Sequence, residues 1–337
     1  MFADIPCLTH SVSLTMSIIT TQENTTESSA SLFFQLISGK TVPDKLWRSK
    51  RFRLKFVLRT LISPLTTLRY LNALSHLPQL PLLMSTQGLL PAKLHRPYLR
   101  SGLSIAARAQ AIIDHYRLMN NLDNPLLRQL LQSATDNVLA TLTGKNGETF
   151  ILSCSSGYFD REGEVTLVLR YNDEIIASLS FSILNENNQR TLLIGGLQGP
   201  RKHINNEMIR EATKAAHGLF PKRLLMEAVF IVAKQCGVES IQAVGDETHV
   251  FRSLRYRHSK GDKFFASYSE FWLSLSGEAR KDGMFTLPLS LPRKTLEEIA
   301  SKKRAEYRRR YELLDALAEQ VYAAAGEHKA DVDQAAA

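Results

Sequence analysis

The chain has 337 residues, of which 44% are hydrophobic and 22% are charged, which is the composition of an ordinary globular protein. This composition excludes a fibrous or wholly disordered chain, and a count of three cysteines excludes a fold held together by disulfides. The net charge of +9 is the unusual value, and charge balance informs us about partners more than about fold.

The positive charge is concentrated in one part of the sequence. No acidic residue occurs from Lys45 to Ile113, and this segment carries twelve lysines and arginines. Because twelve exceeds the net charge of +9, the rest of the chain is slightly acidic. We therefore expect residues 45–113 to meet any anionic partner, and an anionic inner-membrane surface is the partner that this charge suggests.

Residues 1–31 are predicted to form a disordered tail. Asp4 precedes the mildly apolar run 11–19, so the basic start of a signal peptide is missing, and residues 20–31 are rich in Ser, Thr and Asn. The uncharged stretch 70–92 contains three prolines, which disfavour a continuous membrane-spanning helix. We expect a cytoplasmic protein, peripheral to the inner membrane at most, without a signal peptide or transmembrane helix.

Residues 32–143 are predicted to form a basic helical region. Apolar residues at helical spacing predict a helix that ends before Pro64, a second over 104–119 with Ser104 as its cap, and a third over 126–132. Two interpretations fit the first of these helices. It lies on an anionic bilayer, or it is a solvated helix that packs on the rest of the protein. The side chains that would contact the bilayer are Trp47, Phe52, Phe56 and Leu58.

Residues 144–292 have the pattern of an α/β domain. Alternating apolar residues predict half-buried strands, and longer periodic segments that stop at glycine predict helices. The expected elements in chain order are strands at 165–169, 175–183 and 191–197, helices at 206–217 and 221–236, and a strand at 238–244. This order predicts an antiparallel meander followed by a helical crossover. With residues 293–337 as a charged helix and tail, the fold class is α+β.

The third predicted strand ends in a glycine-rich run that is followed by two cations. Backbone N–H groups at the start of a helix, together with Arg and Lys, can hold phosphate groups. The candidate ligands of a phosphate-bearing donor, for example an acyl-CoA, are Gln198, Gly199, Arg201 and Lys202. The alternative is that the glycines only relieve crowding at the strand end. The run matches neither the P-loop nor the Rossmann fingerprint.

Acidic and basic side chains follow the last predicted strand, where ligand sites of α/β folds lie. Glu247 and His249 are the candidate catalytic residues, because an imidazole oriented by a carboxylate can act as a general base. The alternative is structural, and we weigh it more heavily. Asp246 then caps a short helix, and Glu247 pairs with Arg252 or Arg255.

Two other kinds of site are not expected. The nine histidines and three cysteines include no His-x-x-x-His or Cys-x-x-Cys spacing, so no metal site is predicted, and Cys154 and Cys236 are interpreted as small buried residues. Aromatic residues and cations alternate over residues 255–272, but they lie outside the segment of excess charge and form no known motif. Nucleic acid is therefore an unfavoured partner.

Several short blocks occur in order along the chain. They are His95–Leu99, His115-Tyr116, Gly195–Gly199, His217–Lys222, Asp246–Ser253, Glu270–Trp272 and Phe285–Pro288. Together these blocks resemble the VirK/YbjX family of bacterial proteins. The resemblance implies a cytoplasmic or inner-membrane-associated protein of Gram-negative bacteria, linked to virulence, to surface presentation of virulence factors and to resistance against cationic antimicrobial peptides. It implies no catalytic residues.

Residues 144–292 also resemble the fold of GNAT-type N-acetyltransferases, which has a meander, then a strand whose end meets the N-terminus of a phosphate-binding helix, and then another strand. The loop departs from that pattern, since Gln198-Gly199-Pro200 has one glycine and a proline. We therefore carry three hypotheses: an envelope-support protein that transfers acyl or aminoacyl groups, a non-enzymatic membrane-associated adaptor, and an RNA-binding regulator of surface-protein expression.

Overall fold

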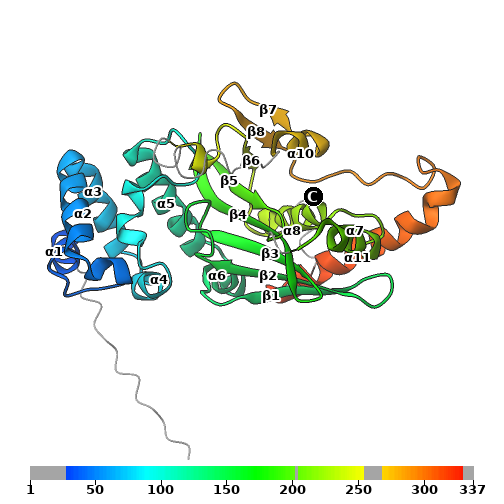
Figure 1. The fold of residues 1–337 in the computed structure, drawn as a ribbon, viewed down its shortest axis with the longest axis horizontal. Coiled ribbons are helices and arrows are strands. Elements are labelled where there is room, and N and C mark those ends of the chain that lie inside the picture. Colours follow the sequence, from blue (N-terminus) through cyan, green and yellow to red (C-terminus); the bar gives the residue numbers. More distant parts are fainter. Residues whose placement is uncertain (1–27, 202–203, 254–267, 329–337) are drawn as a thin grey trace, which may run out of the picture.

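The computed structural model describes residues 28–201, 204–253 and 268–328. Most of the predicted disordered tail falls on residues 1–27 and lies outside the described residues. The described chain forms one mixed sheet of eight strands with helices packed on it, so the predicted α+β class is confirmed (Figure 1). None of the described helices combines the length and apolarity needed to cross a bilayer.

The sheet has the order β1-β2-β3-β4-β5-β6-β8-β7. All neighbouring strands are antiparallel except β5 and β6, which are parallel. This is the predicted meander and crossover, extended by strands at both edges. The strands are β1 Asn137–Thr143, β2 Thr149–Ser156, β3 Val165–Tyr171, β4 Glu174–Glu186, β5 Gln189–Gln198, β6 Ser240–Val244, β7 Glu278–Ala279 and β8 Met284–Leu287.

Strands β1 and β2 were absent from the sequence prediction, and β1 lies within the region that we interpreted as helical. An irregularity in the β1–β2 register between Val138 and Ala140 explains why β1 was missed, because it breaks the two-residue alternation on which the prediction depends. The β3–β4 hairpin is confirmed. Its turn residues Asn172 and Asp173 have φ of 46° and 69°, as a tight two-residue hairpin requires.

The N-terminal helices form a lobe at one end of the molecule, and two further helices connect this lobe to the sheet (Figure 1). The Ser104 side chain accepts a hydrogen bond from the N–H of Ala107, which confirms the predicted cap. The two connecting helices are α5 Ile105–Asn120, which packs on β4, and α6 Pro125–Gln132, which packs on β2. The lobe itself comprises α1 Ser29–Ser38, η1 Lys45–Arg48, α2 Lys50–Ile62, α3 Pro64–Ser75, α4 Leu80–Thr86 and η2 Leu90–His95.

The predicted bilayer-contacting aromatic residues are in the core of this lobe instead. Trp47 and Phe56 are buried, and the Trp47 indole donates to the carbonyl oxygen of Gly88 at 2.7 Å. The ring is thus removed from water and its N–H is hydrogen-bonded. The spacing of apolar residues along a helix does not reveal such a contact with a distant segment. Of the four predicted contacts only Leu58 is exposed.

The C-terminal half supplies a second set of helices. Helix α8 packs on β3 and β4, and α11 packs on α8 and β1. The C-terminal helix was predicted from about residue 293, but it begins at Arg304. Residues 288–300, which we call the strap, carry no regular helix or strand. The elements are α7 Asn206–Ala215, α8 Pro221–Gln235, η3 Val250–Arg252, α10 Tyr268–Ser274, η5 Ser301–Lys303 and α11 Arg304–Ala324.

A buried ion pair joins the N-terminal lobe to the sheet. Lys93, in η2, donates to Oε1 of Glu164 at 2.6 Å, and both side chains are almost fully buried. Tyr116 of α5 donates to the other carboxylate oxygen at 2.7 Å, and Gln87 accepts a second bond from Lys93 at 2.9 Å. Buried charges are tolerated only when paired and hydrogen-bonded, and this pair meets both conditions.

The surroundings keep Glu164 ionised. Burial by itself would raise the pKa of Glu164, but the charge of Lys93 and the hydrogen bonds from Lys93 and Tyr116 outweigh it and hold that pKa below its usual value. Burial lowers the pKa of His115 to about 4, so its ring is neutral at pH 7. Nδ1 of His115 accepts from the N–H of Ile183, and the ring therefore also anchors α5 to β4.

We predict that Lys93→Met lowers the free energy of unfolding by about 3–5 kcal/mol, because Glu164 would remain buried without its cation. Lys93→Met combined with Glu164→Gln should be less destabilising than the single Lys93 change. Urea denaturation measures both, with Lys281→Met at an exposed lysine as the control. Equal costs for Lys93→Met and Lys281→Met would contradict the prediction.

Candidate functional site: a buried acidic cluster where β5 and β6 diverge

The candidate site lies at the carboxyl ends of the two parallel strands. Strands β5 and β6 pair from Thr191 and Ser240 to Ile194 and Ala243, after which β5 continues to Gln198. The register between β5 and β4 also shifts at this point along β5. Gly196 pairs with Ser180 and Ile194 pairs with Phe181, which leaves Gly195 as an extra residue in β5. The bulge and the divergence together create the place where side chains from other segments meet.

Glu162 is the centre of this cluster, and the sequence analysis did not single it out. Its side chain is buried, and the Gln198 side-chain amide donates to its two carboxylate oxygens at 2.9 and 3.0 Å. Nε2 of His249 lies 3.3 Å from Oε1 of the same carboxylate. Two predicted site residues, Gln198 and His249, are therefore brought together by an acid from the loop before β3.

The glycine pair before Gln198 makes room for this acid. A Cβ atom on Gly196 would collide with the Glu162 carboxylate, and one on Gly195 would collide with the Glu162 and Leu99 carbonyl oxygens. Neither glycine has a positive φ, so close approach rather than turn geometry is the requirement. These contacts support the interpretation that the glycines relieve crowding.

The two predicted catalytic residues lie in different environments. His249 is fully buried, and its Nδ1 accepts from the N–H of Phe251 at 3.3 Å, which caps η3. The Glu247 side chain is 82% exposed and lies 3.7 Å from Arg252, the partner that the structural alternative named. Asp246 caps α10 rather than η3, since its carboxylate accepts from the N–H of Tyr268 at 2.6 Å.

Aromatic side chains of α10 lie across the point where β5 and β6 separate. The Tyr268 hydroxyl accepts from the N–H of Leu197 in β5 at 3.3 Å, and the Trp272 indole donates to the carbonyl oxygen of Val244 in β6 at 2.8 Å. The Tyr268 ring lies 5.5 Å from the His249 ring. Burial and the nearby Glu162 raise the pKa of Tyr268 well above its usual value, so the phenol is neutral.

The predicted phosphate ligands do not all point to one place. Gln198 points inward to Glu162, whereas Arg201 is exposed and lies 3.4 Å from the Tyr158 hydroxyl. Gly199 is half-buried beside Lys222, and Lys202 lies outside the described residues. The sequence also predicted that Cys154 and Cys236 are small buried residues, and this prediction is confirmed. Burial raises the pKa of each thiol to about 12.

A carboxylate in contact with an imidazole is a pair capable of general acid–base chemistry. In this cluster Glu162 and His249 are both buried beneath Gln198 and Tyr268. A substrate would therefore have to displace one of these two side chains to reach the pair. Within the described residues, the pair holds together the ends of β5 and the segment after β6.

Comparison with known proteins places the chain in a class whose biochemical activity is unassigned. Residues 45–323 match the model of a family described as a protein of unknown function, DUF535, and the chain belongs to this family. It is 43% identical over 326 residues to the uncharacterized protein YbjX of Escherichia coli strain K12, which covers 95% of this chain and 98% of YbjX. An uncharacterized protein of Haemophilus influenzae is 36% identical over 221 residues, which is 64% of this chain and 70% of that protein.

The packing of Glu162 against β5 leads to a double-mutant prediction. Gly196→Ala should cost about 1–3 kcal/mol of stability through overpacking, and most of this cost should disappear when Glu162→Ala is present. Gly199→Ala is the matched control. Its Cβ would meet only Lys222 at 4.0 Å, so its effect should stay within about 0.5 kcal/mol. If urea denaturation shows that the losses of stability from Gly196→Ala and Glu162→Ala are additive, a side chain at position 196 does not contact Glu162.

Proposed function

We propose that this protein is a peripheral membrane protein that docks on an anionic bilayer through its N-terminal lobe. The observation that carries the proposal is a row of exposed apolar side chains on α2 and the start of α3. These residues, which we call the bilayer face, are between 51% and 77% exposed, and they are Leu54, Leu58, Leu61, Ile62 and Leu65.

The spacing of the bilayer face matches an amphipathic arrangement. Leu54, Leu58 and Leu61 are four and three residues apart, so they share one side of α2. The opposite side of the helix supplies the buried residues Phe56 and Thr60. An apolar stripe left uncovered beside a completed core is the pattern of a helix that lies in a membrane interface.

Exposed cations flank the bilayer face. Arg51 and Lys55 lie on α2, Arg69 on α3, and Lys45 and Arg48 just before them, all exposed. Between residues 28 and 113 the one acidic residue is Asp44, and its side chain is engaged in capping η1. With almost no carboxylate to neutralise them, these cations can each contribute about 1 kcal/mol to binding an acidic leaflet.

The cellular role that we propose follows from the resemblance of the sequence blocks to the VirK/YbjX family. A protein held at the inner membrane can act in support of the cell envelope, including the expression or localisation of surface virulence factors and resistance against antimicrobial peptides. In the adaptor form of this proposal, the bilayer face supplies the location, and no reaction is required of the buried Glu162–His249 pair.

A specific observation favours a second candidate, acyl or aminoacyl group transfer by a GNAT-like domain. Strands β5 and β6 run parallel and separate after Ile194 and Ala243, and β5 has a bulge at Gly195, directly after this point. Such a separation is where a donor could pass between strands, and Gly199 and Arg201 follow the end of β5 at this place. Tyr268 and Trp272 would have to move for the donor to enter, which ranks this candidate second.

We predict that the full chain co-sediments with vesicles that contain phosphatidylglycerol and not with pure phosphatidylcholine, and that added salt weakens the binding. Arg51→Glu changes two charges and should weaken binding by about 2 kcal/mol, or about 30-fold. Leu61→Glu should weaken it as well, because it places a carboxylate in the interface.

The matched controls lie outside the lobe. Arg308→Glu and Leu126→Glu change the same residue types at exposed positions on α11 and α6 and should leave vesicle binding unaltered. Equal loss in these controls, or absence of the wild-type chain from both pellets, would refute the proposal. Salt-sensitive RNA binding that Leu61→Glu leaves intact, without vesicle binding, would favour the RNA-binding regulator.

For the transferase candidate we expect an acyl-CoA to raise the melting temperature of the protein. Arg201→Ala should abolish this shift because it removes a cation from the donor's phosphates. Arg308→Ala, at a remote exposed position, is the control. If no acyl-CoA stabilises the unsubstituted protein, the transferase candidate is wrong, and the adaptor form remains.

A further inference from the structure

We propose that a two-part cavity between α8, α11 and the strap binds a single-chain amphiphile with an anionic head group. The cavity lies beside α11, at the end of the molecule opposite to α1–α3 (Figure 1). It is thus separate from the bilayer face, and it takes an amphiphile as a monomer rather than as part of a membrane.

The first part of the cavity is positively charged. It has a volume of about 440 Å³, which falls within the range of small-molecule sites. Four cations line it against a single carboxylate, Glu227. The cations are Arg223 from α8, Arg293 and Lys294 from the strap, and Arg310 from α11.

Three of these cations are held in place by other groups. Arg223 donates to Glu227 at 3.2 Å, and Arg310 donates twice to the carbonyl oxygen of His217, at 3.0 and 2.8 Å. Arg293 forms a two-pronged contact with Asp315, at 3.1 and 2.9 Å. A guanidinium fixed in this way is oriented before a ligand arrives, which lowers the cost of binding.

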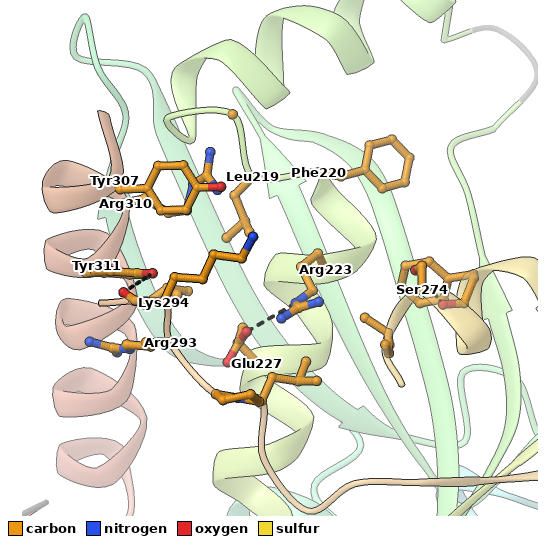
Figure 2. Close-up of a pocket in the computed structure, with 16 residues that line it drawn as sticks. Leu219, Phe220, Arg223, Glu227, Ser274, Arg293, Lys294, Tyr307, Arg310 and Tyr311 are labelled. Atoms are coloured by element: carbon orange, nitrogen blue, oxygen red, sulfur yellow. Dashed lines mark hydrogen bonds and ion pairs between the residues drawn. The ribbon is translucent and has the colours of Figure 1, made fainter. Parts of the chain in front are cut away.

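Lys294 is placed differently. Tyr311 donates to its main-chain oxygen at 3.0 Å, which ties the strap to α11, but its ammonium group forms no ion pair within the described residues. Figure 2 shows the lysine side chain extending from the strap into the space between Arg310 and Arg223. An anion in this space would contact an unneutralised ammonium flanked by two guanidinium groups.

The second part of the cavity is mainly apolar and adjoins the first. It has a volume of about 460 Å³, and the two parts share Glu227, Leu291, Arg293 and Leu314 in their walls. Its remaining walls are mainly hydrophobic. They include Phe230, Ile231, Val238, Leu289, Ala318 and Tyr322, together with the polar side chains of Ser290 and Lys234.

Glu227 stands where the two parts join. Its bond to Arg223 occupies one carboxylate oxygen, and burial raises the pKa of Glu227 despite Arg223 and Arg293 nearby. An anionic head group therefore belongs on the Lys294 and Arg310 side, away from this carboxylate. A ligand that uses both parts must have an anionic end and an aliphatic end, whereas a nucleotide or inorganic anion would use only the first.

Isothermal titration of the full chain with dodecyl phosphate, below its critical micelle concentration, tests the inference. We expect saturable binding of one molecule, much weaker binding of inorganic phosphate, and no binding of dodecyltrimethylammonium. Lys294→Glu should weaken dodecyl phosphate binding about tenfold or more, because a charged contact becomes repulsive. Leu289→Asp should weaken it as well, by placing a charge beside the aliphatic chain.

Matched controls are Lys281→Glu and Leu273→Asp, which make the same changes at exposed positions outside both parts of the cavity. Circular dichroism spectra that match the unsubstituted protein are required of all four variants, as the check that they are folded. The inference is overturned if dodecyl phosphate does not bind, if the controls weaken it equally, if the dodecyl cation binds as well, or if inorganic phosphate binds as tightly as dodecyl phosphate.

The outcome is independent of the proposed membrane function. Leu61→Glu should weaken vesicle binding and leave the dodecyl phosphate titration unaltered, whereas Lys294→Glu should weaken dodecyl phosphate binding and leave vesicle binding unaltered. A failure of the vesicle experiment therefore leaves this cavity to be judged by its own titration.

Discussion

The buried ion pair between Lys93 and Glu164 is the contact on which the rest of the structure depends. Two charges removed from water are a liability unless each is compensated, and here the compensation comes from separate parts of the chain. Gln87 arrives from the end of α4, and Tyr116 from α5. The helical lobe and the sheet therefore share one polar core, and neither can satisfy its buried charge without the other.

The same short segment also builds the cluster at the end of β5. Glu162 and Glu164 flank Gly163, and a Cβ at this glycine would collide with the backbone of Phe181 in β4. Pressed against β4, the segment directs one carboxylate toward Lys93 and the other toward His249. A change in the lobe that moves Glu164 should therefore also shift Glu162 and its hydrogen bonds with Gln198.

The sequence predicted the elements that have regular periodicity, and it failed where long-range contacts decide. The β3–β4 hairpin, β5, the two crossover helices and β6 were predicted because each carries a local pattern with a turn or stop signal at its end, which is Asn172-Asp173 in the hairpin and a glycine or proline in the others. Strand β1 was missed because a bulge interrupts its alternation. Trp47 looked like a membrane contact because nothing nearby in sequence shows that Gly88 accepts its N–H. Glu162 was missed because an acid in a loop reads as solvated until its partners, 36 residues away at Gln198, are known.

The separation of the two charges along the chain has a consequence for biosynthesis. Glu164 follows Lys93 by 71 residues, so at a synthesis rate of about 5–20 residues per second the lysine emerges about 4–14 s before its acid. During that interval the basic helices exist without the sheet that completes their core, and their leucines are left uncovered. Newly made N-terminal segments thus have time to find a partner before the remainder of the protein has been translated.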